Sequence, residues 1–276
     1  MNTKNNQKSV LIIPDLHLAW KVGQKIIDHV GADEIIFLGD FFDDFNDDPN
    51  QINEMVDWLE GSVTKPNRIH LFGNHDCHYA FPQEWFRCSG YEQWKHFIIR
   101  DRIDNKVWDK FKFYHVLDGK WLLSHAGLHK MWLHKNIIAH RKNRTRFFQE
   151  ITDYLDNEIE KGMRNESWVF HAGFARWGIQ RVGGLTWCDH TQEMYPVLGL
   201  HQIYGHTPQS NGTASWIVQD TPQCKPHFKM ANVWVPSKEQ INKTDVSYNL
   251  CLDVHGNTNW AIWNGSELSV HKFSDI

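Results

Sequence analysis

A chain of 276 residues, of which 41% are hydrophobic and 22% charged, is long enough to bury a sizeable core and has the composition of an ordinary globular protein. Its net charge of −4, without a long basic stripe, disfavours nucleic-acid binding through bulk electrostatics. Five cysteines without a C-x-x-C pair disfavour a disulfide framework and a cysteine zinc site.

The beginning of the sequence is polar. Only residues 10–13 are apolar before Pro14, and this run is too short for the hydrophobic part of a secretory signal. No later apolar run approaches the length needed to span a membrane. We therefore expect a cytoplasmic protein without a membrane partner.

The first third of the sequence alternates short apolar runs with amphipathic segments. Strands are expected at 10–13, 34–38 and 68–72, and helices at 24–30, which Gly31 closes, and at 51–59. The apolar strands are typical of strands buried on both faces. This strand–helix–strand–helix–strand order predicts parallel pairing and an α/β core.

In the remainder of the chain, the sequence predicts a mainly helical middle part followed by further strands. A helix is expected at 91–99 and a long charged helix at 145–163, while 111–116 and 120–124 flank Asp118-Gly119 as a hairpin. Further strands are expected at 202–204, 248–253 and 260–263, the last two around a turn at 255–257. We expect one domain over 1–276, with a helical insertion at about 129–165 and an irregular excursion at about 207–245, a region with several prolines.

Five of the predicted strands run directly into polar residues. The five segments are Asp15-Leu16-His17, Gly39-Asp40-Phe41-Phe42-Asp43, Gly73-Asn74-His75-Asp76, His125-Ala126-Gly127 and Gly205-His206. Carboxyl ends of strands are where open α/β sheets place their sites. One such motif is weak evidence, but five in sequence, each after an apolar strand, indicate a functional site.

These motifs, D-x-H, G-D-x-x-D, G-N-H-D, H-A-G and G-H in that order, resemble those of the calcineurin-like metallophosphoesterase superfamily over residues 15–208. The forms H-A-G-L and G-H-T-P are most similar to the branch of serine/threonine protein phosphatases and symmetrical dinucleoside tetraphosphate hydrolases. The resemblance implies an α/β fold of two packed mixed β-sheets flanked by helices, and a dinuclear metal site.

The resemblance also implies the ligands. One ion would take Asp15, His17 and Asp40, and the other Asp40, Asn74, His125 and His206, so that Asp40 bridges. Imidazole and carboxylate together suit Mn²⁺, Fe or Zn²⁺ better than Mg²⁺ or Ca²⁺. We expect two divalent transition metal ions, Mn²⁺ first among them.

The same resemblance implies the catalytic groups. A metal-bridging hydroxide would attack the phosphorus atom, because coordination brings the pKa of water near neutrality. His75 would protonate the leaving alcohol, and Asp43 would orient and charge His75.

Two features depart from the pattern of the branch. Asp44 stands where its protein phosphatases usually carry arginine, so a phosphate-binding arginine would come from elsewhere, with Arg176 or Arg181 as candidates. His171 lies in a second H-A-G sequence and competes with His125. We prefer His125, because its strand follows a hairpin signal and Leu128 extends the match.

The expected activity is hydrolysis of phosphate monoesters, in phosphoproteins or small molecules. The alternatives are a dinucleoside polyphosphate hydrolase and a nucleic-acid phosphodiesterase or end phosphatase, with nucleic acid present only as a substrate. A third alternative, of another class, is an inactive binding scaffold, which predicts lost ligands that the sequence does not show. The partner is thus a phosphorylated substrate. The residues that give the protein its specificity for this substrate are expected in 129–165 and 207–245.

Overall fold

The apolar segment Val10–Ile13 forms β1, the central strand of a five-stranded sheet in the order β11-β10-β1-β2-β3. In this computed structural model, which describes residues 8–221, 223–254 and 258–276, β1 pairs in parallel with β2 (Glu34–Phe37). The parallel run continues to β3 (Arg68–His70), while β10 (Asn259–Trp263) and β11 (Leu268–Lys272) add antiparallel strands. The parallel pairing predicted for the first third is confirmed.

The second sheet has six strands in the order β4-β5-β6-β9-β7-β8. Its first pair, β4 (Tyr114–Leu117) and β5 (Trp121–Ser124), is the predicted hairpin, with Asp118 and Gly119 both at positive φ. β5, β6 (His201–Tyr204) and β9 (Ser247–Cys251) are parallel neighbours. β7 (Ser215–Gln219) and β8 (His227–Met230) complete the sheet in antiparallel fashion.

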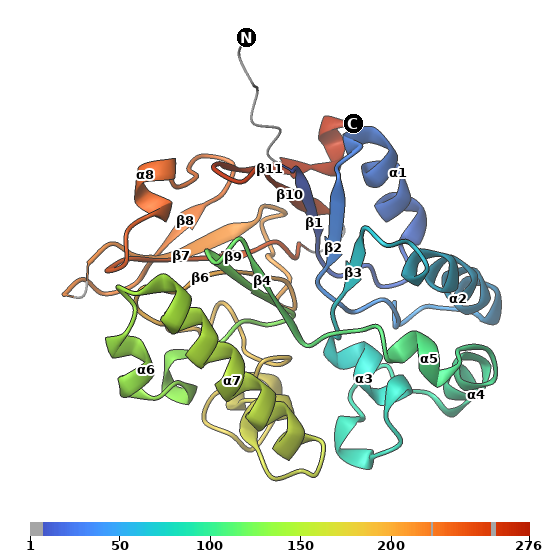
Figure 1. Ribbon diagram of the computed structural model, residues 1–276. Helices are drawn as coiled ribbons and strands as arrows, with labels where there is room; N and C mark the ends of the chain where they lie inside the picture. Colours follow the sequence, from blue (N-terminus) through green and yellow to red (C-terminus); the bar gives the residue numbers. More distant parts are fainter. Residues whose placement is uncertain (1–7, 222, 255–257) are drawn as a thin grey trace.

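Alternate side chains of β1 face two different cores, as the two-residue period of a strand requires. Ile12 joins Leu123, Ile203 and Trp216 in a cluster that draws on both sheets, so the sheets pack face to face. Leu11 and Ile13 point to the opposite side, where they pack in a cluster with residues of the flanking helices. This arrangement is the predicted pair of packed mixed sheets flanked by helices (Figure 1).

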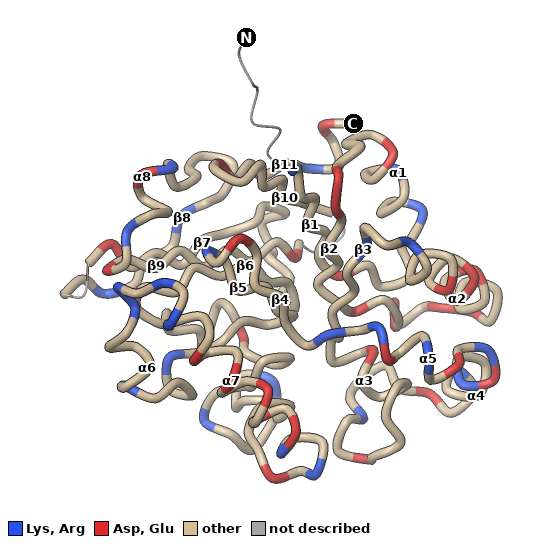
Figure 2. Tube along the Cα trace, in the orientation of Figure 1, with Lys and Arg blue, Asp and Glu red and all other residues tan. Residues whose placement is uncertain are grey.

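The helices cover the outer faces of the sheets (Figure 1). α1 (Trp20–Val30) ends at Gly31 in the left-handed conformation, and α2 (Pro49–Val63) begins at Asp48 with a capping box. The other helices are α3 (Asn74–Ala80), α4 (Gln93–Arg102), α5 (Asn105–Trp108), α6 (Lys135–Ala139), α7 (Arg144–Gly162) and α8 (Lys238–Ile241). Figure 2 shows basic and acidic residues mixed along the outer helices such as α4 and α7.

Two expectations about the carboxyl-terminal third are wrong. The region 207–245 is not irregular, because it contains β7, β8 and α8, and β7 pairs with β9 inside the second sheet. The edge strand β11 follows the last strand that the sequence predicts. The turn expected at 255–257 lies outside the described residues. Among the helices that the structure describes, none is long and apolar enough to cross a membrane.

Candidate active site

Both sheets contribute predicted ligands where their strands end. Asp15 follows β1, Asp40 follows β2, and Asn74 begins α3 soon after β3. His125 directly follows β5, and His206 follows β6 by two residues. Because β1 to β3 are parallel, and β5 and β6 are parallel, the carboxyl ends of these strands meet at one edge of the two-sheet core.

Four of the predicted ligands converge on one point. Nε2 of His125 lies 3.2 Å from Oδ2 of Asp40, 3.0 Å from Oδ1 of Asn74 and 3.1 Å from Nδ1 of His206. Nitrogen and oxygen ligands about 2.1 Å from a single cation are separated by about 3 to 3.4 Å. The spacing of these four groups therefore suits a cation among them.

Asp40 belongs to a second group as well. Asp15, His17 and Asp40 bring one potential ligand atom each within 4.8 Å of one another, with Nε2 of His17 3.7 Å from Oδ2 of Asp40. Asp40 is thus common to two adjacent groups of potential ligands. A carboxylate shared in this way can bridge two ions.

Backbone carbonyls fix the orientation of two of the histidines. Nδ1 of His17 lies 2.9 Å from the carbonyl oxygen of Phe42, and Nδ1 of His125 lies 3.0 Å from that of Leu38. A carbonyl can only accept, so Nδ1 carries the proton in each ring. Nε2 of each ring is thereby directed toward Asp40, as in metal-bound histidines whose other nitrogen donates to the protein.

The electrostatics of the cluster favour positive charge. Burial alone would lower the pKa values of His17 and His125, but neighbouring carboxylates, Asp40 foremost, outweigh burial and raise them to about 9 and about 10. Oδ1 of Asp15 and Nε2 of His206 are buried without a hydrogen-bond partner among the described residues. The unpaired Asp15 oxygen and the mixed nitrogen and oxygen donor set both fit transition metal cations.

Asp253 is a third carboxylate at the site that the motifs did not identify. Burial raises the pKa of Asp253 to about 6, with His17 opposing this shift and Asp40 adding to it. The charge of Asp253 therefore interacts with residues of both groups of potential ligands. It is buried, and its Oδ2 has no hydrogen-bond partner among the described residues. It follows β9, the parallel neighbour of β6, and this adjacency is the signal that could have indicated it.

The strand ends carry unusual backbone conformations. His17, Asp40, Asp43 and His206 all have positive φ, between 40° and 67°. Such values are uncommon for residues with a side chain and are retained where the surroundings enforce them. Asp76 supplies part of this enforcement, because its carboxylate accepts hydrogen bonds from the backbone N–H groups of Asp40, Phe41 and Gly73 at 2.8 Å.

His75 and Asp43, the predicted catalytic pair, lie beside the cluster. Nδ1 of His75 is 2.9 Å from Oδ2 of Asp43, and the His75 backbone N–H donates to Oδ1 of Asp40 at 2.9 Å. Asp43 is fully buried and also accepts from Tyr79 at 2.6 Å and Lys95 at 3.2 Å. Burial would raise the pKa of Asp43, but the hydrogen bonds from histidines lower it well below its ordinary value, so Asp43 is a carboxylate.

A cleft of about 750 Å³ opens over these residues. Its floor includes His17, Asp40, Asn74, His75 and His206. Its walls come from 85–89 and 170–179, together with Phe45, Asn165, Trp187 and Pro208. Each of the ranges 129–165 and 207–245, in which specificity is expected to reside, supplies one residue to the lining of this cleft, Asn165 and Pro208.

The two candidate arginines lie in different places. Arg176 lines the cleft, where Nε is 2.9 Å from Oδ2 of Asp189 and Nη2 donates to the carbonyl of His206 at 3.3 Å. Arg181 lines a separate groove with His129 and Tyr195. Of these two arginines, Arg176 is the one placed to meet a ligand above the cluster of potential metal ligands.

His171 occupies the wall of the cleft and stays outside the cluster. Its Nε2 lies 2.7 Å from Oδ1 of Asn165, and its Nδ1 lies 3.3 Å from Nε2 of Gln180. His125 is the histidine of the two H-A-G sequences that contacts Asp40.

The comparison with solved structures found proteins of low sequence identity, and one with a TM-score above 0.5 has the same fold. A cold-active protein tyrosine phosphatase is 15% identical, with 98% of this chain and 77% of that chain covered and a TM-score of 0.51. A metallophosphoesterase from Sphaerobacter thermophilus is 14% identical, with coverage of 97% and 88% and a TM-score of 0.45. A serine/threonine phosphatase from Saccharomyces cerevisiae is 12% identical, with coverage of 99% and 81% and a TM-score of 0.46.

The comparison with curated proteins gave no match. The family model described as calcineurin-like phosphoesterase matches residues 8–210, which include all five strand-end motifs. The chain therefore belongs to the calcineurin-like phosphoesterase family.

Proposed function

We propose that the protein is a phosphomonoesterase that works with two divalent transition metal ions, Mn²⁺ first among them. The observation that carries the proposal is the position of Asp40, which is shared by two adjacent groups of potential ligands beneath an open cleft. Asp15, His17 and Asp40 would hold one ion, and Asp40, Asn74, His125 and His206 the other. When bound, the ions would supply Lewis-acid charge to the phosphoryl oxygens and lower the pKa of water.

His75 would protonate the leaving oxygen of the ester. Its Nδ1 is engaged by Asp43, which leaves Nε2 for a substrate in the cleft that His75 lines. Asp43 would hold the ring in one orientation and stabilise the imidazolium form, since it is a buried carboxylate. The network around Asp43, with Tyr79 and Lys95, fixes that carboxylate in turn.

Arg176 would bind the phosphate. Its guanidinium lies at the edge of the cluster beside His206, and Asp189 holds it there. An arginine fixed by a carboxylate presents its remaining N–H groups in a defined direction, which suits a tetrahedral oxyanion. Arg176 would thus do the work of the arginine that protein phosphatases of this branch usually carry at the position of Asp44.

The test is a substrate screen with controlled metal content. The protein would be stripped with a chelator and reloaded with Mn²⁺, then assayed on phosphopeptides, small phosphate esters, nucleotides, dinucleoside polyphosphates and phosphodiesters. Monoesterase activity that disappears on chelation and returns with Mn²⁺ supports the proposal. Full activity in the metal-free protein, or activity on diesters alone, contradicts it.

The walls of the cleft favour a second candidate, hydrolysis of nucleotides or dinucleoside polyphosphates. Trp177 is 98% exposed, and Phe45 and Trp85 are also exposed on the same cleft. Aromatic rings of this kind stack on nucleobases, with about 1–3 kcal/mol per base in nucleic-acid complexes. An inactive scaffold has no such support, because the predicted ligands are retained and converge.

Trp177→Ala separates the two candidates. If a base stacks on Trp177, the variant should raise KM for nucleotides at least fivefold and leave KM for phosphoserine peptides unchanged. Phe97→Ala, which also removes an exposed aromatic side chain but on α4 away from the cleft, is the matched control. If KM for every substrate in both variants equals that of the parent, no base stacks on Trp177. The second candidate then loses its support, and the monoesterase proposal stands without a preference for nucleotides.

A further inference from the structure

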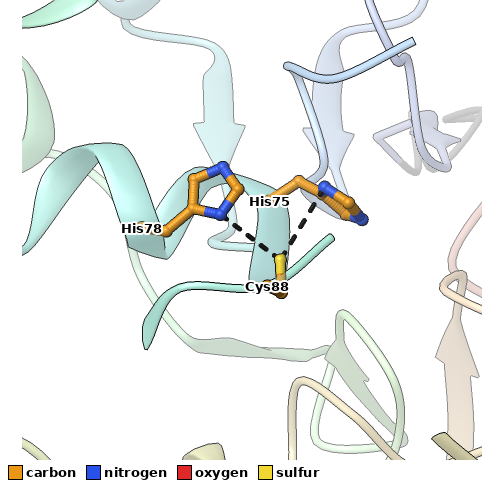
Figure 3. A group of neighbouring side chains, drawn as sticks. All are labelled: His75, His78 and Cys88. Carbon is orange, nitrogen blue, oxygen red and sulfur yellow. Dashed lines mark hydrogen bonds between the residues drawn. The ribbon is translucent and has the colours of Figure 1, made fainter. Parts of the chain in front are cut away.

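Three side chains form a compact group next to the proposed dinuclear site. Sγ of Cys88 lies 3.3 Å from Nδ1 of His78 and 3.9 Å from Nδ1 of His75 (Figure 3). The potential ligand atoms of the three residues all lie within 4.8 Å of one another. His75 and His78 come from α3, and Cys88 comes from the segment after the 3₁₀ turn Glu84–Phe86.

The spacing suits a tetrahedral cation. A zinc ion with bonds of about 2.05 Å to nitrogen and 2.3 Å to sulfur holds these atoms about 3.6 Å apart. The two observed sulfur–nitrogen distances, 3.3 Å and 3.9 Å, lie on either side of this value. A cation among the three atoms would need His75 to turn from Asp43, and water from the cleft would be the fourth ligand.

Asp43 orients His78 for this role. Its Oδ2 lies 2.8 Å from Nε2 of His78, on the opposite side of the ring from Cys88. The short distance places the two groups in contact without an aligned hydrogen bond, and Nδ1, on the other side of the ring, lies next to the sulfur. This carboxylate–histidine arrangement is the one that commonly supports histidine ligands of zinc.

A cation can reach the group from solvent. Cys88 and His75 both line the 750 Å³ cleft, and Cys88 is only partly buried. The segment that carries Cys88 is held in place at Gly90, where φ is +91° and a Cβ atom would lie 2.9 Å from Cγ of Asp43. The sulfur is therefore presented from a fixed turn that packs against the carboxylate of Asp43.

We propose that His75, His78 and Cys88 form a separate inhibitory site for a thiophilic divalent cation, with Zn²⁺ as the natural example. Binding would release the thiol proton of Cys88 to solvent and form the Zn–S bond. The proton on Nδ1 of His75 would move by way of solvent to Nε2, so that the neutral ring could bind the cation through Nδ1 and would give up its contact with Asp43. The inhibition rests on the proposed role of His75, but the binding does not.

The binding test uses Cd²⁺, whose bond to a thiolate absorbs in the ultraviolet. Cd²⁺ would be titrated into the Mn²⁺-loaded protein in a Cys224→Ser background, since Cys224 is an exposed cysteine elsewhere in the chain. One cadmium–thiolate band per chain is expected, and Zn²⁺ should abolish it by competition. The proposed dinuclear site contains no sulfur ligand and cannot give this band.

Two variants assign the band to the site. Cys88→Ser should lose the absorption, and His78→Gln should weaken Cd²⁺ binding at least tenfold while circular dichroism stays that of the parent. A band of full size in Cys88→Ser, or no band in the parent, overturns the proposed site.

The inhibition test compares rates with and without Zn²⁺, each normalised to the zinc-free rate of the same variant. The zinc concentration for half-inhibition should rise at least tenfold in Cys88→Ser relative to the Cys224→Ser parent. An unchanged concentration would mean that zinc inhibits at the dinuclear site, and it would overturn the inhibitory role. A cadmium band in a protein without phosphoesterase activity would instead contradict the proposed function and support the separate site.

Discussion

The carboxylate of Asp15 lies directly against the backbone of Gly205, where a Cβ atom would be 1.9 Å from its Oδ1. The same relationship recurs at Gly73, whose Cβ would be 2.0 Å from Oδ1 of Asp40. Glycine at these two strand ends therefore leaves the volume that the proposed metal-ligand carboxylates occupy.

Gly205→Ala is expected to displace Asp15 and remove one ion. The added methyl cannot be accommodated without moving the carboxylate, so metal analysis should give well under two ions per chain and turnover should fall at least 100-fold. Gly61→Ala in α2 is the control, because its Cβ position lies in open space, with no atom of the described residues within 4 Å apart from its chain neighbours and the backbone of its own helix. It should keep metal and activity and raise stability by about 0.4–1 kcal/mol. Normal metal content in Gly205→Ala would contradict the assignment of Asp15.

Asp40→Asn is expected to be the most damaging single change among the proposed ligands. Asp40 is the carboxylate shared by both groups, so loss of its charge weakens both sites at once. The purified variant should retain well under two ions and almost no activity. Asp44→Asn, a change of the same kind at an exposed neighbour, should retain both ions. Two ions with near-normal turnover in Asp40→Asn would exclude the bridging role.

His75→Ala is expected to keep metal and to slow turnover according to the leaving group. General acid catalysis is typically worth ~10²–10⁴-fold. The loss should be largest for alkyl phosphates and smaller for nitrophenyl phosphate, whose leaving group needs less protonation. Asp43→Asn should show the same trend more mildly, because it acts through His75 at 2.9 Å.

The measurement is a plot of rate against leaving-group pKa for the parent and both variants. His171→Ala, which removes a histidine from the wall of the cleft, should leave the slope of that plot unchanged. A parallel drop for all esters in His75→Ala would show that His75 binds phosphate or positions the site.

His201 is expected to make stability sensitive to acid. Its Nε2 lies 2.9 Å from the carbonyl of Ile241, and its Nδ1 accepts from the N–H of Tyr248 at 3.3 Å, so the ring is neutral. Burial and then the charge of Arg144 lower its pKa from 6.5 to about 3. Between these values the unfolded chain binds a proton that the folded protein excludes, so stability falls as the pH falls, by up to about 1.4 kcal/mol per pH unit.

His201→Gln should therefore flatten the dependence of stability on pH. Urea unfolding would be measured for parent and variant from about pH 7.5 to about pH 5 at the same metal content. The variant should be less stable at the upper end, because it loses packing against Trp121 and Tyr248. The difference in free energy of unfolding between parent and variant should become smaller as the pH falls. A difference that stays constant would contradict the assignment of a buried, neutral His201.

The site was predictable where its residues are local to strand ends. Asp15, Asp40 and Asn74 each follow a short apolar run, and the parallel order of three successive strands brings them to one edge. His125 follows from the hairpin at Asp118 in the same way. In each case the signal spans only a few residues, so pattern alone suffices.

Features that depend on distant pairing were not predictable in the same way. β7 has an apolar run, but its place in the sheet depends on β9, which begins 28 residues after β7 ends. Asp253 is at the site because β9 lies beside β6. The turn that carries Cys88 approaches the cluster because Gly90 fits against Asp43, a contact that no spacing in the sequence encodes.

The cluster of proposed ligands spans two sheets that also pack together through apolar side chains. Asp15, His17, Asp40 and Asn74 extend from the first sheet, and His125 and His206 from the second. Ions bound there would act as a cross-link that closes only in the folded chain, so by mass action they add about 2.7 kcal/mol to unfolding at one hundred times their dissociation constant. Chelation should then increase amide hydrogen exchange first in the segments after β5 and β6. We expect the two sheets to begin to separate there before either sheet unfolds.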